Sequence, residues 1–153
     1  MLSAQHAKVP RPEDYPVDSV FSGTPATPKF ATPGQRRFRT VIRDWARKGP
    51  NFAGRYVIAE WGCGTGCGQM AVVDVKSGDV YDGPFGILPK GVLSLGSNVE
   101  DDNVGMFYRR DSSLLIARGC VNERDGGALY YAWIGARFKL LRRDPIKGLL
   151  CAS

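Results

Sequence analysis

Histidine is almost absent from this chain of 153 residues, in which His6 is the only one. This scarcity argues against hydrolases that use a histidine base, and no serine stands in the strand-to-helix turn typical of a nucleophilic serine. Nor does any apolar run approach the roughly 20 residues that a membrane-spanning helix needs. We therefore expect neither a histidine-dependent hydrolase nor a protein that spans a membrane by helices.

The composition is that of a globular protein, with 43% hydrophobic and 24% charged residues. The length suffices for one domain with a real core. Nineteen glycines and ten prolines indicate many turns, and hence short strands. The net charge is +6, but the positive residues are scattered along the sequence, mostly in pairs. Because nucleic-acid binding needs clustered charge, we do not expect a nucleic-acid partner.

The four cysteines, Cys63, Cys67, Cys120 and Cys151, allow three disulfide connectivities. The simplest closes Cys63 on Cys67 and leaves Cys120 and Cys151 as the second pair, although the sequence does not decide whether that pair forms. Free thiols and a zinc site are the alternatives. Zinc is disfavoured because Cys120 and Cys151 lack the short spacing of metal ligands and only one histidine is present. We expect disulfides, and no metal or cofactor.

Disulfides indicate an oxidising compartment, and the periplasm is the expected location. The first seven residues contain no apolar segment of the kind found in secretory signal peptides. We therefore expect that a signal peptide has been removed from the chain as given.

Residues 1–31 are rich in proline and show no sustained hydrophobic period. They are predicted to form an extended arm that lies on a single β-rich domain of residues 32–153. Val17, Val20 and Phe21 are the apolar residues expected to hold this arm against the domain.

A single helix is predicted over residues 33–48. Thr32 is placed to cap it, Pro33 suits its first position, and Gln35 completes a capping box. Apolar residues then recur at three- and four-residue spacing, and Lys48-Gly49-Pro50 ends the helix. Packing of this helix over a sheet is the expected role.

The chain after Pro50 is predicted to be antiparallel β-structure, because short β-prone segments alternate with turn sequences. The predicted strands are 55–61, 69–75, 80–81, 92–95, 106–108, 114–117, 129–134 and 137–141. The expected fold class is therefore mostly β (α+β), an antiparallel sheet or blade-like hairpins with one N-terminal α-helix.

A glycine-rich segment, residues 62–68, joins the first two predicted strands. It resembles the cofactor loop of S-adenosylmethionine-dependent methyltransferases, but a strand rather than a helix is predicted to follow it. Three residues separate its cysteines, whereas thioredoxin-like redox pairs have two. We interpret it as a rigid loop suited to binding a partner. The expected contact residues are Gly62, Gly64, Thr65, Gly66 and Gly68.

Carboxylates offer an alternative. Glu60, Asp74, Asp101 and Asp102 are candidates for an acid–base pair in a small enzyme. Exposed carboxylates at strand edges and turns are common, however, so we do not expect an enzyme.

A resemblance to known proteins is carried by Asn51–Val57, which runs into Trp61–Cys67, and by the following segment Val73–Tyr81. They resemble small exported bacterial proteins, many of which lack an assigned role. Tyr108–Leu115 and Tyr130–Trp133 are similar in character. The pattern also resembles periplasmic immunity proteins of type VI secretion systems that neutralise peptidoglycan amidase effectors.

The resemblance implies steric inhibition, in which the glycine-rich loop, with Thr65 at its tip, enters the cleft of a cysteine–histidine amidase. Two further loops would make flanking contacts through Glu100, Asp101, Asp102, Asn122, Glu123 and Arg124. The alternatives are an envelope protein with another binding role and a small carboxylate-dependent periplasmic enzyme. The oligomeric state stays open.

Overall fold

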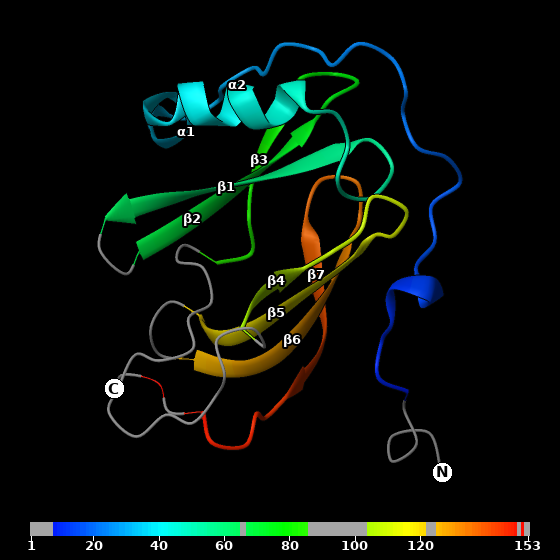
Figure 1. Ribbon diagram of the computed structural model, residues 1–153, viewed down its shortest axis with the longest axis vertical. Coiled ribbons are helices and arrows are strands. Elements are labelled where there is room, and N and C mark those ends of the chain that lie inside the picture. Colours follow the sequence, from blue (N-terminus) through cyan, green and yellow to red (C-terminus); the bar gives the residue numbers. More distant parts are fainter. Residues whose placement is uncertain (1–7, 65–66, 86–103, 122–124, 150, 152–153) are drawn as a thin grey trace.

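Two antiparallel sheets build the protein (Figure 1). The computed structural model describes residues 8–64, 67–85, 104–121, 125–149 and 151. Sheet 1 has the order β1-β2-β3 and consists of β1 (Tyr56–Gly64), β2 (Cys67–Asp74) and β3 (Val80–Asp82). Sheet 2 has the order β4-β5-β6-β7 and consists of β4 (Gly105–Phe107), β5 (Leu114–Val121), β6 (Asp125–Trp133) and β7 (Phe138–Asp144). The predicted mostly β, α+β fold is confirmed.

The helical segment differs from the single helix predicted over residues 33–48. It is divided at Phe38 into α1 (Pro33–Arg37) and α2 (Arg39–Arg47), and a short 3-10 turn, η1 (Pro12–Asp14), precedes them. The predicted cap is confirmed, since Thr32 Oγ1 accepts a hydrogen bond from the Gln35 amide at 3.1 Å. The buried Gln35 side chain donates to the carbonyl of Val80, the first residue of β3. Because α1 is tied to β3 while α2 packs along β1, the chain bends between them.

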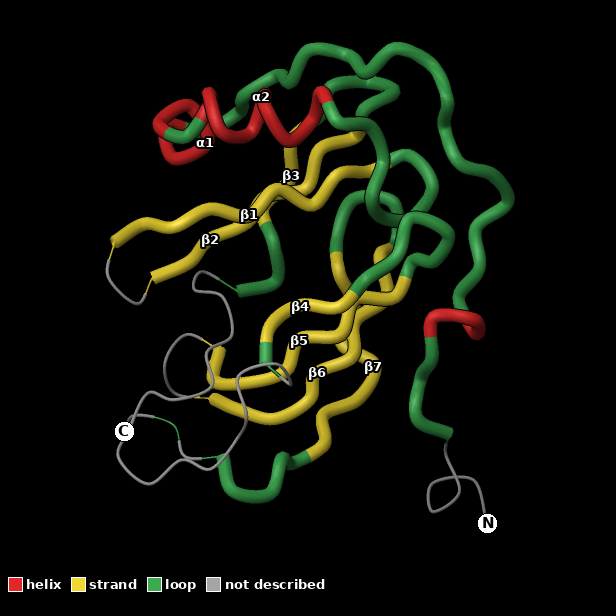
Figure 2. Tube along the Cα trace, in the orientation of Figure 1, coloured by secondary structure: helices red, strands yellow, loops and turns green. Residues whose placement is uncertain are grey.

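The two faces of sheet 1 bury different partners. In β1, Tyr56 and Ile58 point toward sheet 2, whereas Val57 and Ala59 point toward the helices, as expected for side chains that alternate along a strand. The first face joins an aromatic-rich core that includes Trp133 of β6. The second joins a cluster with residues of α2. The molecule is therefore layered as helices, sheet 1 and sheet 2 (Figure 2).

The N-terminal arm, described from residue 8, crosses both sheets through backbone hydrogen bonds. The Val17 amide donates to the Asp111 carbonyl before β5, and the Phe21 amide donates to the Gly54 carbonyl before β1. Further along, the Lys29 amide donates to the Gly78 carbonyl in the β2–β3 turn. Of the three residues expected to hold the arm, Val17 and Phe21 are half-buried and Val20 is exposed.

Several strands differ in extent from the prediction. The segment 125–127, expected in a loop, belongs to β6, which pairs with β5 from Asp125 to Ala132. The strand predicted at 92–95 lies outside the described residues. Tyr130 and Ala132 lie on one face of β6, and the alternation along the strand could have left that face open to a partner. Both are buried, and Tyr15 of the arm and Ile146 pack against the cluster that contains Tyr130.

One disulfide joins Cys120 at the end of β5 to Cys151. This pairing fixes the C-terminal segment against β5 and β6, and it fits an oxidising compartment. The side chains of Cys63 and Cys67 lie outside the described part of the structure, so their bridge stays a prediction. Within the described residues no helix has the length and apolarity to span a bilayer.

Candidate functional site

The far end of the β1–β2 hairpin is the candidate site. β3 pairs only with residues 71–73 of β2, so residues 60–64 and 67–70, here called the distal hairpin, extend beyond it. Figure 1 shows the two strands projecting past the rest of sheet 1. An element that extends beyond its sheet can present a strand edge for contact.

The glycine-rich segment, expected as a loop from residue 62 to 68, is mostly strand. Gly62 pairs with Gly68 and Gly64 pairs with Cys67, with a register shift between the two pairs. Only Thr65 and Gly66 lie between the strands, and they are outside the described residues. Glycine-rich residues were expected to form a loop without strand pairing. Backbone hydrogen bonding between the strands nevertheless continues through them, since it requires no side chain.

The outer edge of β1 is covered up to Glu60. The Asn51 amide group accepts from the Ile58 N–H at 2.7 Å and donates to the Ile58 carbonyl at 3.1 Å. Trp45 Nε1 of α2 donates to the Glu60 carbonyl at 2.9 Å. No described residue continues this cover along Gly62, which is exposed. The strand edge at the distal hairpin is therefore accessible to a partner.

A groove of about 620 Å³ lies beside the distal hairpin, between β1–β2 and α1. Its floor includes Trp61 and Gln69, which are directly opposite each other across the two strands. The sequence interpretation did not identify this groove. The alternation along β1 was the available signal, because it places Trp61 on the helix-facing side with Val57 and Ala59.

Aromatic and charged side chains line the groove together. The Phe38 and Trp61 rings lie 5.1 Å apart, and the Arg37 guanidinium lies 5.6 Å from the Phe38 ring centre. On the other wall Asp82 accepts a hydrogen bond from Gln35 Nε2 at 3.3 Å. The groove thus combines apolar rings with one cation and one carboxylate, which suits a peptide-like ligand better than a purely apolar one.

Of the carboxylates considered for catalysis, Glu60 has a partner in the other sheet. It accepts a hydrogen bond from the Tyr108 hydroxyl at 2.7 Å, and both residues are half-buried. Burial first, and then the bond to Glu60 and its charge, raise the pKa of Tyr108 above its ordinary value. This contact joins β1 to the segment after β4.

Asp74 lies at the other end of the hairpin. It is buried, its Oδ2 lies 2.9 Å from Arg55 Nη2, and its Oδ1 accepts from the Lys76 amide. The register places Asp74 opposite Tyr56, four residues from Glu60 along β1. Four residues of strand span about 13 Å, so Glu60 and Asp74 are too far apart to act on the same bond. The structure therefore does not bring these two together.

The remaining predicted residues lie outside the described part of the chain, namely Glu100, Asp101, Asp102, Asn122, Glu123 and Arg124. Among the described residues no group of three or more histidine, cysteine, aspartate or glutamate side chains is placed to hold a metal ion. Comparison with protein-family models, with curated proteins and with solved structures finds no match to this chain.

Proposed function

We propose that this chain is an exported binding protein that engages another protein through the distal hairpin. The observation that carries the proposal is the extension of residues 60–64 and 67–70 beyond β3, with an open strand edge at Gly62. The groove beside it offers Trp61 and Gln69 to the same partner. Because the hairpin is held by β1–β2 pairing and by Asn51, little ordering is left to occur on binding.

The partner we propose is a peptidoglycan amidase effector of a type VI secretion system, which makes this chain its periplasmic immunity protein. The support is the resemblance of the segment 51–81 together with the narrow, small-residue end of the hairpin. A narrow strand pair with glycine at Gly62, Gly64 and Gly68 can enter a cleft that excludes larger loops. Inhibition would then be steric, by denying the substrate access.

An inhibition assay tests this function. The immunity function predicts an amidase effector encoded beside the gene; that effector is mixed with the purified protein, and the release of free amino groups from purified peptidoglycan is followed. We expect stoichiometric inhibition with nanomolar affinity. Gly62→Tyr should abolish it, since Gly62 is exposed, lies in β1, and is not among the residues with positive φ.

The control places the same side chain elsewhere. Ala136 is exposed in the turn between β6 and β7, so Ala136→Tyr should inhibit like the unmodified protein. Equal inhibition by both variants would contradict a role for the distal hairpin. Full amidase activity in the presence of the unmodified protein would contradict the immunity function itself.

A further inference from the structure

The solvent-facing side of α1 and α2 carries most of the excess positive charge of the molecule. Residues 33–48 contain six basic side chains and a single carboxylate, Asp44, in a chain whose net charge is +6. The basic residues are Arg36, Arg37, Arg39, Arg43, Arg47 and Lys48. We refer to them as the basic helical face. All six lie within residues 36–48, and they belong to the helical layer of the fold.

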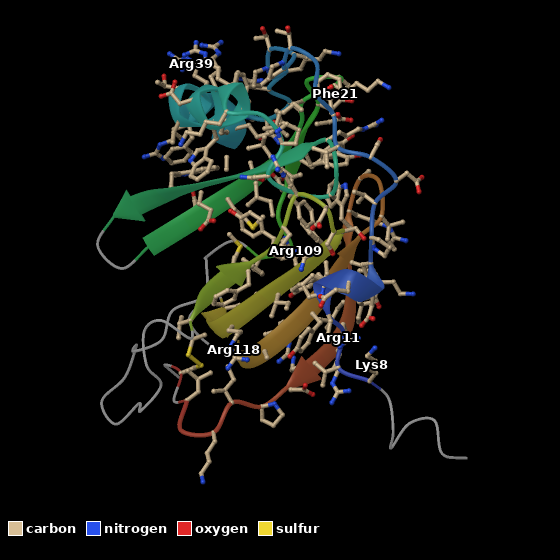
Figure 3. All side chains as sticks on the ribbon, turned by 45° about the vertical axis from the view of Figure 1, so that its right-hand side comes forward. Lys8, Arg11, Phe21, Arg39, Arg109 and Arg118 are labelled. Carbon is tan, nitrogen blue, oxygen red and sulfur yellow. A yellow bond between two sulfur atoms is a disulfide. The ribbon has the colours of Figure 1, made fainter. Side chains whose placement is uncertain are left out.

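Helical geometry orders three of these charges. Arg39, Arg43 and Arg47 follow one another at four-residue intervals, so they lie along one side of α2, about 6 Å apart along its axis. Arg36 of α1 adjoins this row, because its carbonyl accepts a hydrogen bond from Arg39 Nη1 at 3.1 Å. Figure 3 shows Arg39 at the end of the molecule that carries the helices, turned away from the sheets.

The opposite side of α2 is firmly docked, so this face has a fixed orientation. Ile42 and Ala46 are buried in the cluster shared with sheet 1, and Trp45 Nε1 bonds to the Glu60 carbonyl. The only carboxylate on the helices, Asp44, pairs with Arg47, and both side chains are exposed. One carboxylate offsets only one of the six cations, so the face keeps an excess of positive charge.

The aromatic rings near this face are covered by its cations. Lys48 Nζ lies 4.2 Å from the Trp45 ring centre, and the Arg43 guanidinium lies 5.5 Å from that of Phe30. None of the exposed large apolar side chains in the described part of the chain lies on α1 or α2. Apart from Phe38 and Trp61 in the groove beside Arg37, the face therefore offers charge without rings for stacking on bases, and it has no exposed large apolar group for insertion into a membrane.

We infer that the basic helical face is a docking surface for a bilayer that contains anionic phospholipid. Charge complementarity supports this occupant, since basic side chains attract the negative headgroups and are screened by salt. The Cys120–Cys151 disulfide fits an oxidising compartment, where lipid headgroups rather than nucleic acids are the abundant anions. Docking would be peripheral, with the helices against the headgroups. The inference is independent of the partner proposed for the distal hairpin.

The experiment compares two variants of equal charge by sedimentation with vesicles of phosphatidylcholine containing phosphatidylglycerol. The first is Arg36→Gln/Arg39→Gln/Arg47→Gln, on the basic helical face. The second is Arg137→Gln/Lys139→Gln/Arg143→Gln, which removes three exposed cations in and beside β7 of sheet 2. Both variants carry three charges fewer than the natural chain. Neither set includes a residue assigned to the distal hairpin.

We expect the unmodified protein to bind these vesicles at low salt and not vesicles of phosphatidylcholine alone. The helical variant should bind on the order of a hundredfold more weakly, because each basic residue near an anionic surface typically contributes about 1 kcal/mol and three are removed. The β7 variant should lose less than about threefold. Arg36→Lys/Arg39→Lys/Arg47→Lys keeps the charge and should bind like the unmodified protein, and an unchanged circular dichroism spectrum of the glutamine variant excludes misfolding as the cause of its loss.

Three results would overturn the inference. Equal losses in both glutamine variants would mean that only the net charge matters. Absence of binding by the unmodified protein would mean that the face is simply solvated. Tighter binding to single- or double-stranded DNA than to the vesicles at the same salt would identify a nucleic acid as the occupant.

Discussion

Buried polar side chains hold adjoining segments together at two places in sheet 1. Asp74 joins the start of the β2–β3 turn to Arg55 before β1, and Gln35 joins α1 to Val80. Each of the two side chains has hydrogen-bonding or ionic partners, and without them its burial would lower the free energy of unfolding. Such residues contribute to stability in a way that their charge alone does not reveal.

Asp74→Ala should lower the free energy of unfolding by about 1–3 kcal/mol, because it leaves the Lys76 amide without its acceptor and Arg55 without its counter-ion. Urea unfolding followed by circular dichroism measures this. Asp44→Ala removes a carboxylate from an ion pair exposed on both sides and should cost less than about 0.5 kcal/mol. Similar losses in the two variants would show that burial of Asp74 has no special effect.

The Tyr108 hydroxyl gives the stability a pH dependence at alkaline pH. Its pKa is raised in the folded protein, so the unfolded chain loses this proton first, above about pH 10. The contribution of this group to the free energy of unfolding should therefore be constant below that pH, and it should fall as the pH rises further. In Tyr108→Phe the fall between pH 9 and pH 11 should be smaller. Parallel curves for the two proteins would show that Tyr108 does not carry the effect.

At the scale of elements, the arm and the β2–β3 turn depend on one glycine. Gly78 has a φ of +89°, and a Cβ there would collide with the Thr27 carbonyl oxygen. The arm makes a second contact with this turn, a hydrogen bond of 2.7 Å from the Lys29 amide to the Gly78 carbonyl. The arm can lie this close to the turn only because no side chain intervenes.

Gly78→Ala should therefore destabilise the protein more than Gly49→Ala does. Gly49 ends α2 with a similar φ of +85°, but a Cβ there meets nothing within 4 Å. Gly49→Ala should cost about 1 kcal/mol from backbone strain alone, and Gly78→Ala should cost at least about 1 kcal/mol more. Thermal and urea unfolding compare them. Equal costs would contradict the close packing of the arm.

Some of these elements could be predicted from the sequence and others could not. Alternation from Tyr56 to Ala59 was enough to predict a strand, because both of its faces are buried by ordinary apolar contacts. The break at Phe38 was not predictable, since it follows from the contact of Gln35 with Val80, 45 residues away. Gly62 and Gly68 gave a loop signal, and only their mutual pairing makes them strand.

At the scale of the molecule, the layers bring together surfaces that lie far apart in the sequence. The groove beside Trp61 forms only when α1 lies over the distal hairpin, so the alternation along β1 indicates the side of the sheet on which Trp61 lies but not the groove itself. The charges of the basic helical face lie within residues 36–48, and the docking of the opposite side of α2 on sheet 1 leaves them toward solvent. By contrast, the mostly β fold and the pairing of cysteines in some form were predictable, because they depend on composition and turn residues.

The Cys120–Cys151 disulfide should contribute to the stability of the whole chain. It closes a loop with a sequence separation of 31, for which the chain-entropy estimate is about 3–4 kcal/mol. Cys120→Ala/Cys151→Ala should therefore lower the Tm by roughly 10 °C in a calorimetric scan. Cys63→Ala/Cys67→Ala should lower it less, since any bridge there closes a far shorter loop. An unchanged Tm in the first variant would contradict a structural role for the bridge.

The most direct test of the proposed binding function uses the tagged protein, its Gly62→Tyr variant and its Ala136→Tyr variant as baits in the envelope fraction of the native host. Bound proteins are quantified by mass spectrometry. We predict one peptidoglycan amidase in near-stoichiometric amount with the unmodified and Ala136→Tyr baits, and its loss with Gly62→Tyr. The absence of an amidase from all three eluates, or its equal recovery with both variants, would contradict the account.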